Sequence, residues 1–183
     1  MKLESKAFKN EKQIPTRYTC DGENIHPPLE ISDQPKHTRS LCLIMDDINA
    51  TDEAGWNFLH WTMWNIRPHT TSIQAGEVPL GVTQGKTSFS NYHYGGPCPP
   101  GGKVHRYRFR LFALSKELEV SPDSSAEELE EEIAGHILDE TELFGTYDRN
   151  GPPFWKKPTE KELGEKPDKS RMPPPEEFGY GEE

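Results

Sequence analysis

The segment HRYRFRLFAL, residues 105–114, opens with a strict alternation of two kinds of side chain. His105, Tyr107, Phe109 and Leu111 fall on one side, and three arginines fall on the other. Because successive side chains of a β-strand point to opposite faces, this pattern predicts a strand with one buried face. The arginine side is expected to be the solvated outer face of the same sheet.

Two further segments predict neighbouring core strands. The run SLCLIM, residues 40–45, is continuously apolar and has the length of a strand buried on both faces. It is followed directly by Asp46 and Asp47. The segment FLHWTMWNI, residues 58–66, is rich in aromatic and β-branched residues, which favour strands, and His60 lies near its start.

Residues 121–145 predict the one good helix of the chain. Ser124 or Ser125 can cap its N-terminus, and a glutamate three residues after either serine completes a capping box. The helix carries an apolar stripe at a spacing of four residues, which consists of Leu129, Ile133 and Ile137.

Residues 144–149 are expected to end the fold as a short strand or turn.

Length and charge narrow the class of protein. The chain has 183 residues, which suits one domain with its own core. We assign this domain to residues 1–149, because residues 150–183 are built of proline and charge and cannot bury enough surface to fold alone. The net charge of −10 argues against nucleic-acid binding. No transmembrane segment or signal peptide is found, so a cytoplasmic location is expected.

The three cysteines fit no zinc motif. An odd number in a chain expected in the cytoplasm argues against a disulfide framework. Cys42 lies within an apolar run and is expected to be a small buried residue. Cys20 and Cys98 both lie in loop-like segments rich in glycine and proline, and the sequence leaves open whether they pair.

Polar residues stand at the ends of the predicted core strands. If these strands are neighbours, Asp47, His60, His105 and Tyr107 converge at one rim of a sheet. Polar groups next to apolar runs need partners, so a purely structural Asp–His hydrogen bond is one interpretation. The others are a metal site with two histidines and a carboxylate, a hydrolase, and a pocket for a phosphate-like anion. No GxSxG or HExxH motif supports a hydrolase or a catalytic metal.

The loop GGPCPPGGKV, residues 95–104, leads directly into His105. Its prolines remove backbone donors and fix backbone angles. Its glycines allow a close approach to a ligand and are expected to leave the remaining N–H groups exposed. We therefore predict that this loop forms one wall of a binding pocket.

Several segments resemble the phosphatidylethanolamine-binding protein family. DDINAT, FLHWTMWNI and YGGPCPPGGKVHRYRF are similar to its two signature regions, and the bacterial and archaeal Raf kinase inhibitor-like (YbhB/YbcL type) branch matches more closely. YTCDGENIHPPLEIS and ELFGTYDR resemble motifs near the two ends of that branch. The resemblance covers about residues 1–149. It implies a mainly β fold, an antiparallel sandwich in which a large sheet packs on a smaller one, with a few peripheral helices.

The resemblance also implies a function. Members of the family are binding or inhibitory proteins that act on kinases or proteases, with a pocket for phosphate-like anions that include phospholipid head groups. A non-enzymatic binding protein without cofactor or metal is therefore expected, with a homodimer as a further possibility. The alternative is a hydrolase that uses the same Asp/His group, with or without a metal. The ligand-binding residues carried over are Asp47, His60, Gly96, Pro99, Pro100, His105 and Tyr107.

The sequence departs from the family pattern around Asp47. Where the family has Asp-Pro-Asp-Ala-Pro, this chain has Asp-Ile-Asn-Ala-Thr, so Ile48, Asn49 and Thr51 replace proline, aspartate and proline. The loss of one carboxylate should make the pocket less negative. In the N-terminal motif, His26 stands where serine is common.

Overall fold

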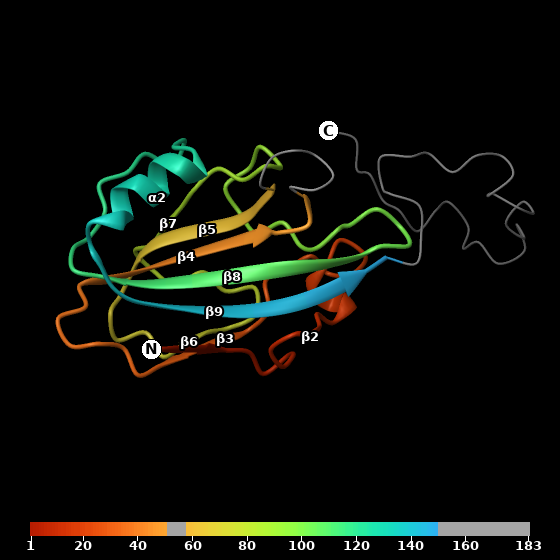
Figure 1. Ribbon diagram of the computed structural model, residues 1–183, viewed down its shortest axis with the longest axis horizontal. Helices are drawn as coiled ribbons and strands as arrows, with labels where there is room; N and C mark the ends of the chain where they lie inside the picture. The colour runs from red at the N-terminus through yellow and green to blue at the C-terminus, as the bar shows by residue number, and fades with distance from the viewer. Residues whose placement is uncertain (51–57, 150–183) are drawn as a thin grey trace, which may run out of the picture.

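The computed structural model describes residues 1–50 and 58–149, which form two packed β-sheets (Figure 1). The large sheet has the strand order β2-β9-β8-β4-β5-β7, and the small sheet has the order β1-β3-β6. All paired strands are antiparallel except β2 and β9, which are parallel. The elements are β1 (Lys2–Glu4), β2 (Lys12–Gln13), the 3-10 helix η1 (Thr16–Tyr18), β3 (Leu29–Ser32), β4 (Ser40–Asp47), β5 (Phe58–Ile66), β6 (Ser72–Ile73), β7 (Thr83–Gln84), β8 (Val104–Leu114), α2 (Ala126–Ala134) and β9 (Ile137–Asp148).

The three strands predicted from the sequence form the centre of the large sheet. β4 is buried along its whole length, as its continuous apolar run predicts. β8 buries alternate residues from His105 to Leu111, so the predicted face assignment is confirmed. The main core lies between the sheets and includes Leu43, Trp61, Met63, Tyr107 and Phe109. The mainly β two-sheet architecture is therefore the expected one.

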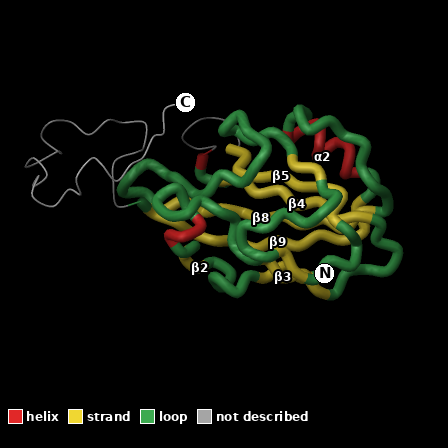
Figure 2. Tube along the Cα trace, turned by 180° about the vertical axis from the view of Figure 1, so that it is seen from behind, coloured by secondary structure: helices red, strands yellow, loops and turns green. Residues whose placement is uncertain are grey.

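A second core lies on the other face of the large sheet. Helix α2 lies at the end of this sheet away from the β9 arrowhead, and the view from behind places it at the same end (Figures 1 and 2). Leu129 and Ile133 of α2 are buried in a cluster with Cys42, Trp64 and Phe112. The helix therefore covers part of a sheet face that the sequence predicts to be solvated.

The predicted helix is too long. It begins as expected, with Ser125 as N-cap in a capping box with Glu128. It ends at Gly135, and residues 137–148 form strand β9 instead. β9 pairs with β8 from His105 opposite Tyr147 to Leu114 opposite Ile137. Long-range pairing with the open edge of β8 satisfies a row of backbone groups, and this outweighs the local helical pattern that Ile137 suggests.

The arginine face of β8 is not simply solvated. Arg108 donates two hydrogen bonds to Asp46, at 3.0 and 2.6 Å, and Asp46 has no exposed side-chain surface. Arg110 is only 14% exposed and bridges Asp46 at 3.4 Å and Glu130 of α2 at 2.5 Å. The row is therefore an ion-pair network between the sheet and the helix.

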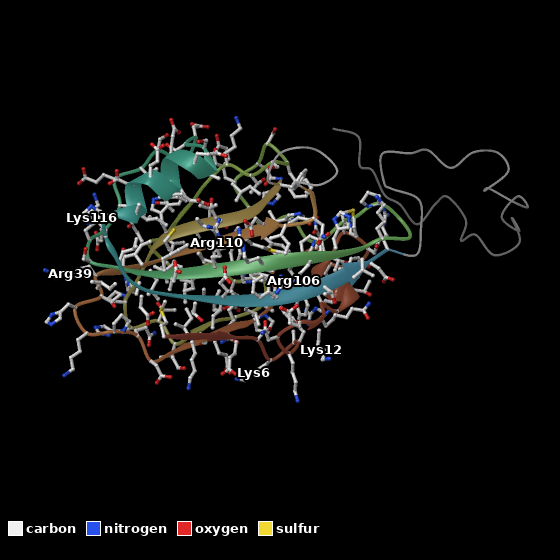
Figure 3. The ribbon with its side chains drawn as sticks, in the orientation of Figure 1. Lys6, Lys12, Arg39, Arg106, Arg110 and Lys116 are labelled. Carbon is white, nitrogen blue, oxygen red and sulfur yellow. A yellow bond between two sulfur atoms is a disulfide. The ribbon has the colours of Figure 1, made fainter. Side chains whose placement is uncertain are left out.

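Basic side chains elsewhere are also paired. Figure 3 shows labelled lysines and arginines spread over the molecule from Arg39 and Lys116 at one end to Lys12 on the lower side. Arg106 forms an ion pair with Glu11, Lys6 with Glu30, and Lys116 with Glu132. Arg106, Lys6 and Lys116 are therefore each paired with a nearby carboxylate.

Some expectations fall outside the part of the chain that the structure describes. The predicted tail, residues 150–183, lies there, as does Thr51. Within residues 1–50 and 58–149, no helix combines the length and apolar character needed to cross a bilayer.

We expect Asp46→Asn to lower the free energy of unfolding by about 2 kcal/mol, because it leaves two guanidinium groups beside a neutral amide. Urea denaturation measures the change. Glu142→Gln is the matched control, since its carboxylate is 42% exposed and lies 3.6 Å from Arg108. The control should change stability by less than about 0.5 kcal/mol. Equal effects of the two variants would contradict a buried network.

Candidate functional site

Three strands bring the predicted polar residues to one end of the large sheet. Asp47 is the last residue of β4 and pairs with Tyr107 of β8 in the antiparallel register. His105 lies two residues before Tyr107, on the same face of β8. His60 enters from β5 at a bulge, where Leu59 and Trp61 pair with consecutive residues of β4. The bulge leaves His60 out of the ladder, which re-aims its side chain toward Tyr107.

A buried Asp–His pair forms the centre of the site. His105 Nδ1 donates to Asp47 Oδ2 at 2.7 Å, and both side chains are almost completely buried. Asp47 Oδ1 accepts from the backbone N–H groups of Asn49 at 3.0 Å and Ala50 at 3.2 Å. The carboxylate is therefore held by three donors, which fixes the orientation of the His105 ring.

His60 is held by the glycine-rich loop. Its Nδ1 lies 2.6 Å from the carbonyl oxygen of Gly95, which can only accept, so Nδ1 carries the proton. Burial lowers the pKa of His60, and this outweighs the Gly95 carbonyl and the Asp47 carboxylate, which raise it. The ring also packs against Phe58 and Phe89. His60 Nε2 is therefore the ring atom available for a further contact.

Tyr107 lies between the two histidines. Its ring stands edge-on to His60 at 5.1 Å and nearly parallel to His105 at 6.5 Å between ring centres. Its hydroxyl is buried and makes no geometrically satisfactory hydrogen bond to any described residue. Burial raises the pKa of this phenol, and the nearby Asp47 carboxylate adds to the effect. Tyr107 is therefore a neutral group with a buried hydroxyl inside the cluster.

The glycine-rich loop differs from its predicted role. The Gly95 N–H donates to the backbone oxygen of His60 at 3.0 Å, and the Gly96 N–H donates to Asn24 Oδ1 at 2.8 Å. These two donors are therefore engaged within the protein rather than exposed. Pro99 is buried and Pro100 is half-buried. A ligand-binding role for Gly96, Pro99 and Pro100 stays a prediction.

The N-terminal segment fastens this loop to the rest of the molecule. Cys20 and Cys98 form a disulfide, with Cα atoms 5.5 Å apart and a sequence separation of 78. The Tyr94 hydroxyl donates to the backbone oxygen of Tyr18 at 2.7 Å. The pairing answers the question the sequence left open and corrects the expectation drawn from the odd cysteine count. Because such bonds are rare in a reducing cytosol, the cytoplasmic location stays a prediction.

Asp21 of the same segment reaches the end of β9. It accepts hydrogen bonds from the Tyr147 hydroxyl at 2.9 Å and from Arg149 at 2.7 Å. The first and last parts of the described chain therefore meet beside the site.

Two departures from the family pattern have structural explanations. Asn49 Oδ1 accepts the backbone N–H of Arg106 at 2.7 Å, so its side chain is used to tie the loop after β4 to β8. His26 is buried and stacks on Trp61, with 4.6 Å between ring centres. Its ring nitrogens face the carbonyl oxygens of Pro27 and Glu77, so it fills space and joins two loops.

The metal alternative finds no set of ligands among the described residues. Within the described ranges, no three His, Cys, Asp or Glu side chains gather in a way that could hold an ion.

Sequence reasoning missed two residues beside the site: Phe89, which packs on His60, and Asn24, which accepts a hydrogen bond from Gly96. Asn24 belongs to the N-terminal motif YTCDGENIHPPLEIS, which could have indicated it, whereas Phe89 belongs to no motif and only the folded loop reveals it.

Two packed sheets with a buried Asp–His pair at the sheet end define a mainly β protein with a polar site in an apolar setting. The sequence model "Phosphatidylethanolamine-binding protein" matches residues 4–148, and the chain belongs to this family. The residues that match the family include the whole Asp47–His60–His105–Tyr107 cluster.

Several relatives are similar along most of their length. A UPF0098 protein of Methanothermobacter thermautotrophicus is 44% identical over 154 residues, which are 81% of this chain and 99% of the relative. The crystal structure of a putative phosphatidylethanolamine-binding protein homolog from Chlamydia trachomatis aligns with a TM-score of 0.73 at 35% identity, covering 80% of this chain and 96% of that one. Escherichia coli YbcL, described as a member of the mammalian PEBP family, aligns with a TM-score of 0.74 at 27% identity, covering 81% and 98%.

We expect Asp47→Ala to lower the free energy of unfolding by about 3 kcal/mol, because it leaves three buried N–H donors without their acceptor. Chemical denaturation followed by tryptophan fluorescence measures this loss. Asp33→Asn serves as control, since Asp33 is 61% exposed and pairs with Lys2 at the surface. A loss below about 1 kcal/mol for Asp47→Ala would show that the carboxylate is not a structural centre.

Proposed function

We propose that this chain is a non-enzymatic binding protein that takes a phosphate-like anion, such as a phosphorylated head group, at the Asp47–His60–His105–Tyr107 cluster. The observation that carries the proposal is the pair of imidazoles held by their Nδ1 atoms, one by Gly95 and one by Asp47. The Gly95 contact orients the His60 ring so that a further contact goes through its Nε2, and the Asp47 contact fixes the orientation of the His105 ring. A protonated Nε2 donates to a phosphate oxygen, and the Tyr107 hydroxyl supplies another donor.

The role of Asp47 follows from its contacts. Its two oxygens already accept one imidazole and two backbone donors. We therefore assign Asp47 to orienting His105 rather than to meeting an ammonium group of the ligand. A carboxylate hydrogen-bonded to one ring nitrogen fixes the tautomer and orientation of a histidine in the same way in other proteins.

The regulatory part of the proposal is the inhibition of a kinase or protease target. Membership of the family is its sole support. A shared fold does not transfer a partner from one member to another, so the target has to be identified by experiment. The hydrolase alternative is tested by the same experiments as anion binding.

Titration with inorganic phosphate by calorimetry tests the anion site. His105→Gln should weaken phosphate binding by about tenfold or more, because one charge-assisted hydrogen bond is lost. His60→Ala should act in the same direction. His69→Ala is the matched control, because His69 is an exposed histidine away from the cluster. Absence of phosphate binding to the wild-type chain, or turnover of p-nitrophenyl phosphate that both variants abolish, would overturn the proposal.

Phosphate binding should depend on pH in a defined direction. Burial lowers the pKa of His60, so the free protein holds this ring neutral at pH 7. Binding that uses His60 Nε2–H must take up a proton, so affinity should rise as the pH falls from 8 to about 6. Calorimetry in buffers of different ionisation enthalpy counts that proton. A flat affinity profile from pH 5 to 8 would contradict recognition by histidine.

A further inference from the structure

A cavity lies beside the Cys20–Cys98 disulfide. Its volume is about 350 Å³, at the lower end of the range for small-molecule sites. None of the four cluster residues lines it, but Phe89 and Gly95 separate it from His60. The cavity is therefore a neighbour of the proposed anion site and not part of it.

Two asparagines, Asn24 and Asn91, line this cavity. Asn24 Oδ1 accepts the Gly96 N–H at 2.8 Å, and Asn91 Oδ1 accepts the His93 N–H at 3.3 Å and the Thr87 hydroxyl at 3.0 Å. A backbone N–H can only donate, so the accepting atom in each case is the oxygen. Each Nδ2 is therefore left for another partner, and neither makes a hydrogen bond to any described residue.

The rest of the lining favours an anion with an apolar body. It holds no carboxylate, lysine or arginine among the described residues, and it includes Phe89, Tyr94 and the disulfide. His93 also lines the cavity, and its Nδ1 lies 3.1 Å from the carbonyl oxygen of Tyr94. Two amide donors match the two oxygens of a carboxylate, whereas a phosphate dianion would lack a cationic partner.

We propose that this cavity, lined by Asn24, Asn91 and Phe89, binds a small organic carboxylate whose apolar or aromatic body packs on Phe89. The two Nδ2 groups donate to the carboxylate oxygens, and the disulfide wall keeps Asn24 in place. The ligand has the size of an aromatic or short branched acid, as the volume of the cavity allows. No bond is formed or broken.

Benzoate is the probe, followed by chemical-shift changes in the full chain. We expect a saturable shift with a Kd on the order of 1 mM, and little response to benzamide, which lacks the charge. Asn24→Asp and Asn91→Asp each retain the accepting oxygen but replace the NH2 donor by a negative oxygen. Each should weaken benzoate binding by about tenfold or more. Gln74→Glu adds the same charge at an exposed position outside the lining and should leave binding unchanged.

Competition with phosphate separates the two sites. Saturating inorganic phosphate should leave benzoate affinity unchanged, because the cluster residues do not line the cavity. The proposal is overturned if phosphate displaces benzoate, if benzamide binds equally well, or if no saturable shift occurs up to about 20 mM benzoate. It is also overturned if both Asp variants, folded by circular dichroism, bind as the wild type does.

Discussion

A buried carboxylate cannot remain charged without partners, and this rule applies to Asp47 at the centre of the site. It lies at the end of β4 between the sheets, where water does not solvate it. Three N–H groups replace that water, and they come from β8 and from the residues just after β4. The same bonds that compensate the charge also determine where His105 points and how the chain leaves β4. Stability and site geometry therefore share one set of contacts.

The glycine-rich loop is positioned by its neighbours on both sides. On the inner side, Gly95 exchanges two hydrogen bonds with His60, one through its oxygen and one through its N–H. On the outer side, Asn24 and the disulfide hold Gly96 and Cys98. The loop is thus a wall between two spaces, and recognition on either face falls to side chains rather than to free backbone donors.

Alternation and apolar runs predicted β4, β5 and β8 because their side chains report burial directly. They also placed Asp47, His60, His105 and Tyr107 at one rim, since strand ends that neighbour each other share an edge. β9 could not be predicted in the same way: Ile137 continues a helical spacing, and only pairing with β8 draws it into a strand. The Cys20–Cys98 bond and the contact of Phe89 with His60 join distant segments without a local pattern, so no spacing could reveal them.

The parallel pairing of β2 with β9 joins residues near the two ends of the described chain. Contacts over so long a sequence separation make loop closure slow, so this edge is expected to form late in folding. On the ribosome, β4, β5 and β8 emerge before β9, yet Asp21 acquires its partners Tyr147 and Arg149 only when β9 has left the exit tunnel. The wall beside the site is therefore completed only after β9 has been synthesised, and until then a nascent chain carries an open β8 edge.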